Sequence, residues 1–181
     1  MTSKQPPNKA EIELAEYEAV DPTGYRRALS CFATGVAVVT ALDGNGAKAG
    51  ITINSFSSVS LDPPLILWSV AEDSTSYDIF TRAGYFAVHV LSRQQQELSG
   101  RFAQRAGDKF AGLDCREGIS GVPILGEYAA LFECSTEHVY PGGDHKIIVG
   151  RVHRFEARDA EPLVLHRSRF LTTAHKPLML P

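Results

Sequence analysis

The stretch GITINSFSSVSLDPPLI, residues 50–66, has the composition of a strand but an unusual set of polar side chains. β-Branched and apolar residues fill much of it, and a Pro-Pro pair closes it. It also carries one amide and five hydroxyls: Asn54, Thr52, Ser55, Ser57, Ser58 and Ser60. A solvent-facing strand would normally mix in Lys and Glu, yet no charge occurs here before Asp62. Uncharged donors of this kind indicate a surface that meets a polar, partly buried ligand.

Outward from this stretch, short strands alternate with hairpin turns and a few helices. The pattern predicts strands over residues 35–42, 47–54, 64–71, 85–91, 127–140, 145–158 and 161–166. It predicts helices over 21–33, 76–84 and 92–103, the first with Tyr25, Leu29 and Phe32 on one face. Strands and turns in this proportion favour a mainly β, antiparallel barrel over a doubly wound sheet. We expect a polar N-terminal arm over residues 1–20 and one barrel domain over residues 21–181.

Composition narrows the class of protein. The 181 residues carry a net charge of −3 and no Lys/Arg block, so we expect no nucleic-acid partner. The longest apolar run, residues 63–71, is far shorter than a membrane span needs, and residues 1–20 show no signal-peptide core. Cys31, Cys115 and Cys134 share no CxxC spacing, which predicts reduced thiols and a cytoplasmic location.

Several catalytic motifs are absent from the sequence or lack the context that they need. GNGAKA, residues 44–49, fits the spacing of a dinucleotide fingerprint, but the following ITINSF is a poor helix, so a hairpin is predicted instead. The six histidines show no HxH, HxxxH or HExxH spacing, and no metal site is predicted. No GxSxG elbow is present.

For two features, the sequence allows both a structural and a functional interpretation. Ser and Thr side chains on a strand often bond only the backbone or water, so the hydroxyl stretch has a structural as well as a ligand-binding interpretation. His145, in PGGDHK, follows a glycine turn and is either a turn residue or a donor to a substrate group at the barrel rim.

Seven blocks in a fixed order carry a family resemblance. They are FATGVAVVT (32–40), GITINSFSSVSLDPP (50–64), STSYDIF (74–80), FAVHVLSRQQQELSGRFA (86–103), DKFAG (108–112), GDHKIIVGRV (143–152) and PLVLHRSRF (162–170). Together they resemble the flavin reductase family with the FMN-binding split-barrel fold, from about residue 24 to residue 170. These are the small reductase components of two-component flavin monooxygenases.

The resemblance implies a six-stranded antiparallel split β-barrel with Greek-key topology and a few flanking helices. It implies a homodimer, with NADH (or NADPH) as hydride donor and FAD or FMN as acceptor. Reduced flavin would pass, by diffusion, to a partner flavin-dependent monooxygenase. Two other interpretations stay open: another split-barrel enzyme, such as a pyridoxamine-phosphate-oxidase-like or cobalamin-related reductase, and a non-enzymatic flavin-binding module.

The resemblance also implies roles for individual residues. The flavin would be bordered by Thr34, Val36 and Thr40, its ring and ribityl chain contacted by Thr52, Asn54 and Ser55, and its phosphate bound by Ser57, Ser58 and Ser76. Phe110 is a candidate stacking residue, and His89 stands where the family often has Asn.

The nicotinamide side would hold Arg167, Arg169, Phe170 and His145. His145 is the candidate catalytic residue, through contact with the nicotinamide cofactor and without a proton-transfer role. Leu165, Ser168 and Phe170 depart from common family residues, which leaves the choice between NADH and NADPH open.

Overall fold

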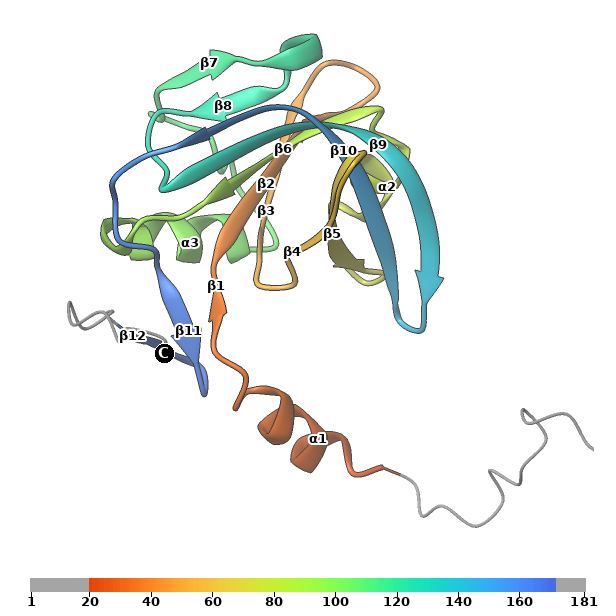
Figure 1. Ribbon diagram of the computed structural model, residues 1–181, viewed down its shortest axis with the longest axis vertical. Coiled ribbons are helices and arrows are strands. Elements are labelled where there is room, and N and C mark those ends of the chain that lie inside the picture. The colour runs from red at the N-terminus through yellow and green to blue at the C-terminus, as the bar shows by residue number, and fades with distance from the viewer. Residues whose placement is uncertain (1–19, 172–181) are drawn as a thin grey trace, which may run out of the picture.

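The structure is a computed structural model that describes residues 20–171, and strands dominate it (Figure 1). The strands are β1 (Thr34–Gly35), β2 (Ala37–Leu42), β3 (Lys48–Ile53), β4 (Ser57–Leu61), β5 (Pro64–Ala71), β6 (Tyr85–Val90), β7 (Cys115–Glu117), β8 (Pro123–Leu125), β9 (Ala130–Gly142), β10 (His145–Ala157), β11 (Val164–His166) and β12 (Arg169–Leu171). The helices are α1 (Pro22–Leu29), α2 (Tyr77–Arg82) and α3 (Gln96–Ala103), with short 3₁₀ turns η3 (Arg93–Gln95) and η4 (Ile119–Gly121). The expected arm lies outside the described residues, except for Val20.

The main sheet has seven strands in the order β3-β2-β6-β9-β10-β5-β4, and every neighbouring pair is antiparallel. Two small sheets, β1-β11-β12 and β7-β8, flank it. The mainly β, antiparallel prediction is confirmed, although six strands were expected. The extra strand is β4, the second half of the hydroxyl stretch, because the chain turns at residues 54–56 instead of continuing from β3.

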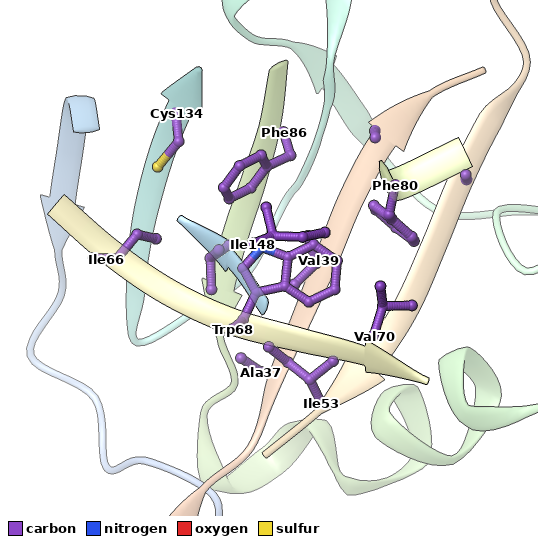
Figure 2. Close-up of a cluster of buried hydrophobic side chains, with 13 residues drawn as sticks. Ala37, Val39, Ile53, Ile66, Trp68, Val70, Phe80, Phe86, Cys134 and Ile148 are labelled. Atoms are coloured by element: carbon purple, nitrogen blue, oxygen red, sulfur yellow. The ribbon is translucent and has the colours of Figure 1, made fainter. Parts of the chain in front are cut away.

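The turn at residues 54–56 joins the two edge strands of the sheet, which curls around a packed interior. Trp68 is fully buried there and meets Phe80 and Phe86 edge-on, with ring centroids 5.1 and 5.8 Å apart (Figure 2). Phe80 comes from α2, and it is the buried residue of that helix. Cys134 is also buried in this cluster, and burial raises the pKa of its thiol to about 12. The barrel centre is therefore filled by side chains, and a ligand must bind on its outside.

Helix α1 begins where the sequence predicts, and Asp21 caps it by accepting hydrogen bonds from Thr23 N and Gly24 N at 3.1 and 2.7 Å. No residue of α1 is buried. The predicted apolar face stays in solvent, with Tyr25, Leu29 and Phe32 each more than half exposed. Figure 1 shows α1 extending away from the barrel. In a single chain, this face therefore stays largely uncovered.

Within residues 20–171, no helix has the length and apolarity needed to cross a membrane. In the same range, no three His, Cys, Asp or Glu side chains gather in a way that could hold a metal ion. All three cysteines are free thiols.

Candidate functional site

A first cavity, of about 290 Å³, lies between β3 and α3 and contains no charged residue. It is lined by Val36, Thr52, Ile53, Asn54, Ser99, Gly100, Ala103, Leu165 and Phe170. We call it the uncharged cavity. Helix α3 turns small residues toward it, and a Cβ added at Gly100 would meet no atom within 4 Å. Glycine inside a helix lowers its stability by about 1 kcal/mol relative to alanine, so the open space beside Gly100 comes with a less stable helix. Thr52 ties the two walls together, because its Oγ1 donates to Ser99 O at 2.7 Å.

Asn54 and Leu165 also line a second cavity, of about 230 Å³, which is thus next to the first. Its lining residues are Arg26, Leu29, Ser30, Phe32, Thr34, Asn54, Leu165, Arg167 and Ser168, and we call it the arginine cavity. Asn54 is exposed at the junction, and its amide has no hydrogen-bond partner among the described residues. The buried Thr34 Oγ1 also has none in this part of the chain. Two uncommitted polar groups therefore point to a ligand at this junction.

The third cavity, of about 190 Å³, lies at the other end of β3. It is lined by Lys48, Ala49, Gly50, Thr75, Ser76, Ile79, Arg105, Gly107, Asp108, Lys109 and Phe110, and we call it the cationic cavity. Three cations against one carboxylate, with two hydroxyls, suit a phosphate.

Lys109 and Phe110 fix the loop that forms one wall of the cationic cavity. Lys109 Nζ donates to Gly50 O and Phe102 O, both at 3.1 Å, and burial lowers the pKa of this ammonium group. The Phe110 ring meets Phe102 edge-on at 5.1 Å, and Lys48 Nζ lies 5.9 Å from the Phe110 ring centroid. A Cβ on Gly50 would fall 2.3 Å from the Phe102 ring, so this contact requires glycine.

The three cavities form one sequence of environments along β3. From Lys48 to Asn54 the strand advances six residues, about 20 Å at 3.3 Å per residue. The uncharged cavity lies in the middle of this series. The cationic cavity supplies cations at the Lys48 end, and the arginine cavity supplies them beyond Asn54. A planar, neutral heterocycle with a phosphate tail fits the uncharged and cationic cavities, and a second phosphate-bearing nucleotide fits the arginine cavity. A flavin nucleotide has the first of these shapes.

Eight of the predicted site residues line these cavities. The structure brings together Thr34, Val36, Thr52, Asn54, Ser76, Phe110, Arg167 and Phe170. Phe110 lies at the cationic end, where it packs on Phe102. Arg167 has a left-handed backbone (φ 48°), its N–H donates to Ser30 O at 2.8 Å, and its Nη2 lies 3.7 Å from Cys31 Sγ.

Two predicted cofactor residues belong to the core instead, and for them the prediction was wrong. Thr40 is fully buried, and its Oγ1 donates to Pro123 O at 2.6 Å. His89 is also fully buried: Nε2 accepts from Leu125 N at 3.1 Å, and Nδ1 lies 3.1 Å from Val38 O, to which it donates. Burial lowers the pKa of this imidazole to about 4, so the ring is neutral. With both nitrogens engaged, His89 joins strands and has no polar atom for a cofactor.

The second half of the hydroxyl stretch also lies outside the cavities. Ser55 Oγ accepts from Ser69 N at 3.0 Å and so fixes the turn between β3 and β4. Ser57 and Ser58 are exposed on β4, at the opposite edge of the sheet from β3, and line none of the three cavities. Within one chain, these serines do not occupy the predicted phosphate end.

His145 begins β10 at the tip of the β9–β10 hairpin and lines none of the three cavities. Its half-exposed ring places Nδ1 2.7 Å from Asp144 Oδ1, and this bond lowers the pKa of the Asp144 carboxyl. Arg169 is exposed on β12. The β9–β10 tip and the β11–β12 hairpin lie on opposite sides of the molecule in Figure 1. One chain alone therefore separates His145 from the other residues predicted for the nicotinamide side.

Sequence reasoning missed two groups of site residues. The first is the trio Ser99, Gly100 and Ala103, whose spacing along a predicted helix could have shown one face of small residues. The second is the cationic set Lys48, Arg105 and Lys109. These residues are far apart in the sequence, and only the approach of the loop after α3 to β3 brings them together.

Comparisons with known proteins agree with this geometry. The model of the flavin reductase like domain matches residues 29–174. A probable flavin reductase of Rhizobium meliloti (strain 1021) is 47% identical over 155 residues, 86% of this chain, although the chain spans only 50% of that relative's length. The reductase subunit HsaB of a flavin-dependent monooxygenase from Rhodococcus jostii (strain RHA1) is 41% identical, covering 84% of this chain and 78% of HsaB.

A solved structure gives the same result. The NADH:FAD oxidoreductase SgcE6 of Streptomyces globisporus C-1027, in complex with NAD and FAD fragments, aligns with a TM-score of 0.81 at 36% identity, over 88% of this chain and 98% of that one. Fold, cavity chemistry and sequence therefore agree, and the chain belongs to the flavin reductase like domain family.

Proposed function

We propose that this protein is an NAD(P)H-dependent flavin reductase, which transfers hydride from NADH, or from NADPH, to FAD or FMN. The observation that carries the proposal is the run of cavities along β3, uncharged in the middle and cationic at the end. The flavin ring would lie in the uncharged cavity, with its phosphate in the cationic cavity. The nicotinamide nucleotide would approach through the arginine cavity, where Arg26 and Arg167 face its phosphates. The activities of similar proteins, among them the NADH:FAD oxidoreductase SgcE6, support this assignment.

The two nucleotides supply the hydride chemistry when bound, and the protein supplies position and environment. Asn54 lies where the uncharged and arginine cavities meet, so its free amide can orient a ring at the point of contact. Gly100 and the neighbouring small residues leave room for a flat ring, and the Thr52–Ser99 hydrogen bond holds that space at a fixed width. Neutral donors also bind oxidised flavin only moderately, which suits an enzyme that releases its reduced product.

The recipient of the reduced flavin would be a flavin-dependent monooxygenase, reached by diffusion. This follows the reductase subunit HsaB, which serves such a monooxygenase. The uncharged cavity is open to solvent in the described part of the chain, because its lining residues Asn54 and Phe170 are both exposed. We place the reaction in the cytoplasm, where the three free thiols would stay reduced.

We further propose a homodimer. The apolar side chains of α1 remain exposed on a single chain, and a second copy would cover them. A second copy could also bring the His145 hairpin of one subunit to the arginine cavity of the other, which one chain does not do. Light scattering tests this: a fully active species of about 20 kDa would rule it out, while about 40 kDa is expected.

Steady-state oxidation of NADH and of NADPH, with FAD, FMN and riboflavin in turn, tests the activity. Many turnovers per enzyme are expected with at least one pair. A flavin carrier would bind flavin and show no turnover. Absence of both binding and turnover with all three flavins would refute the proposed function.

A further inference from the structure

A contact between two distant loops borders the cationic cavity, which Arg105 and Thr75 line. Arg105 follows α3, and its Nη1 lies 3.2 Å from Oδ2 of Asp73, which follows β5. Arg105 Nη2 also donates to the Asp73 carbonyl. On the same side, Thr75 Oγ1 donates to Arg105 O at 3.2 Å. We call the side-chain pair the Arg105–Asp73 clasp.

We propose that Arg105 is the residue that recognises the phosphate of a flavin nucleotide, and that Asp73 competes with this phosphate for the guanidinium. The inference rests on the proposed function and assigns a specificity-determining pair within it. Arg105 would leave Asp73 when the phosphate enters and return to it when the flavin departs.

Among the three cations that line this cavity, Arg105 is the one paired with an exposed carboxylate, a partner that another anion can replace. Lys109 is committed to two backbone carbonyls, and Lys48 lies over the Phe110 ring. The Arg105 and Asp73 side chains are 68% and 76% exposed. An ion pair this exposed is weak, so another anion can displace it. A guanidinium also binds two phosphate oxygens at once, which an ammonium group does not.

The surroundings of the clasp limit the exchange to side-chain motion. The Thr75 hydrogen bond holds the Arg105 backbone at the cavity wall, and Lys109 anchors the same loop a few residues later. The Asp73 carboxylate therefore lowers the affinity for phosphate without any movement of the loop that walls the cationic cavity. A lower affinity hastens departure of the reduced flavin, because differences in affinity among related complexes arise mostly in the dissociation rate.

FMN and riboflavin are the probes, since they differ only in the phosphate. Binding of each is measured by flavin fluorescence without NADH, on the full chain and at low salt. Arg105→Gln is expected to weaken FMN binding about tenfold and to leave the riboflavin Kd unchanged. Asp73→Asn is expected to tighten FMN about threefold, to slow its dissociation by a similar factor, and again to leave riboflavin unchanged.

The double variant separates the clasp from simple repulsion between Asp73 and the phosphate. If the carboxylate acts by holding Arg105, Asp73→Asn has no further effect once Arg105→Gln is present. Asp78→Asn is the matched control, because Asp78 pairs with Arg82 at 3.1 Å with similar exposure but outside the cationic cavity. It should leave both Kd values unchanged.

Tightening of FMN by Asp73→Asn that persists in the double variant would overturn the clasp. So would equal changes for FMN and riboflavin in either single variant, or an unchanged FMN Kd in Arg105→Gln. Failure of the wild-type protein to bind any flavin would instead refute the proposed function, which keeps the two failures apart.

Discussion

The buried imidazole of His89 makes stability depend on pH, and His89→Asn should remove that dependence. His89 is fully enclosed, donates to Val38 O and accepts from Leu125 N. Burial is the main reason that its pKa falls from 6.5 to about 4, partly offset by the bond to Val38. An asparagine side chain does not titrate, and its amide can still donate to the Val38 carbonyl.

The sign follows from proton binding in the two states. Below pH 6.5 the unfolded chain takes up a proton on this histidine, whereas the folded protein does not until about pH 4. Folding is therefore favoured fully above pH 6.5, and this contribution is lost as pH falls. The loss amounts to about 2 kcal/mol between pH 7 and pH 5 and about 3 kcal/mol over the whole range.

The free energy of unfolding in urea, measured at several pH values between 7 and 4.5 and at fixed protein concentration, tests this. Wild type should lose about 2 kcal/mol more stability than His89→Asn between pH 7 and pH 5. His153→Asn controls for removal of a histidine at the protein surface. Parallel pH profiles for wild type and His89→Asn would refute a neutral, buried His89.

The other predictions concern the uncharged cavity and His145. Asn54→Ala should weaken flavin binding by about 1–3 kcal/mol with little change in nicotinamide affinity, and an unchanged flavin Kd by fluorescence titration would contradict its place at the cavity junction. Gly100→Leu should fill the uncharged cavity, abolishing flavin binding while raising Tm or leaving it unchanged, since leucine favours a helix over glycine by up to about 1 kcal/mol; a Tm fall with flavin binding retained would argue against this. His145→Ala should raise the NADH KM about tenfold, about 1.4 kcal/mol, and also lower kcat if the imidazole positions the ring. Unchanged kinetic constants would leave His145 as a turn residue.

The sequence alone determined the mainly β fold, most strand positions and the family. β-Branched runs separated by glycine turns predict antiparallel strands, and 64–71 matches β5 while a turn at Gly143 and Asp144 joins β9 to β10. Ser92 and Gln95 lie three apart, the spacing of a capping box, and the structure shows that Ser92 N donates to Gln95 Oε1 at 2.8 Å. The lack of charge around Asn54 and Thr52, a local property of one strand, indicated a surface that meets a ligand, and the family resemblance implied their contact with the flavin.

Only the tertiary structure decided which polar residues face a ligand. The family resemblance implied His89 and Thr40 as site residues, yet their side chains meet backbone groups of Val38, Leu125 and Pro123 in the core. The turn at Ser55 sends Ser57 and Ser58 to the opposite sheet edge, which the continuous hydroxyl run conceals. The cationic cavity joins Lys48 to Arg105, 57 positions apart, through the packing of Phe102 on Gly50. Periodicity reports the face of one strand, whereas the partner of that face is set by contacts between residues distant in the chain.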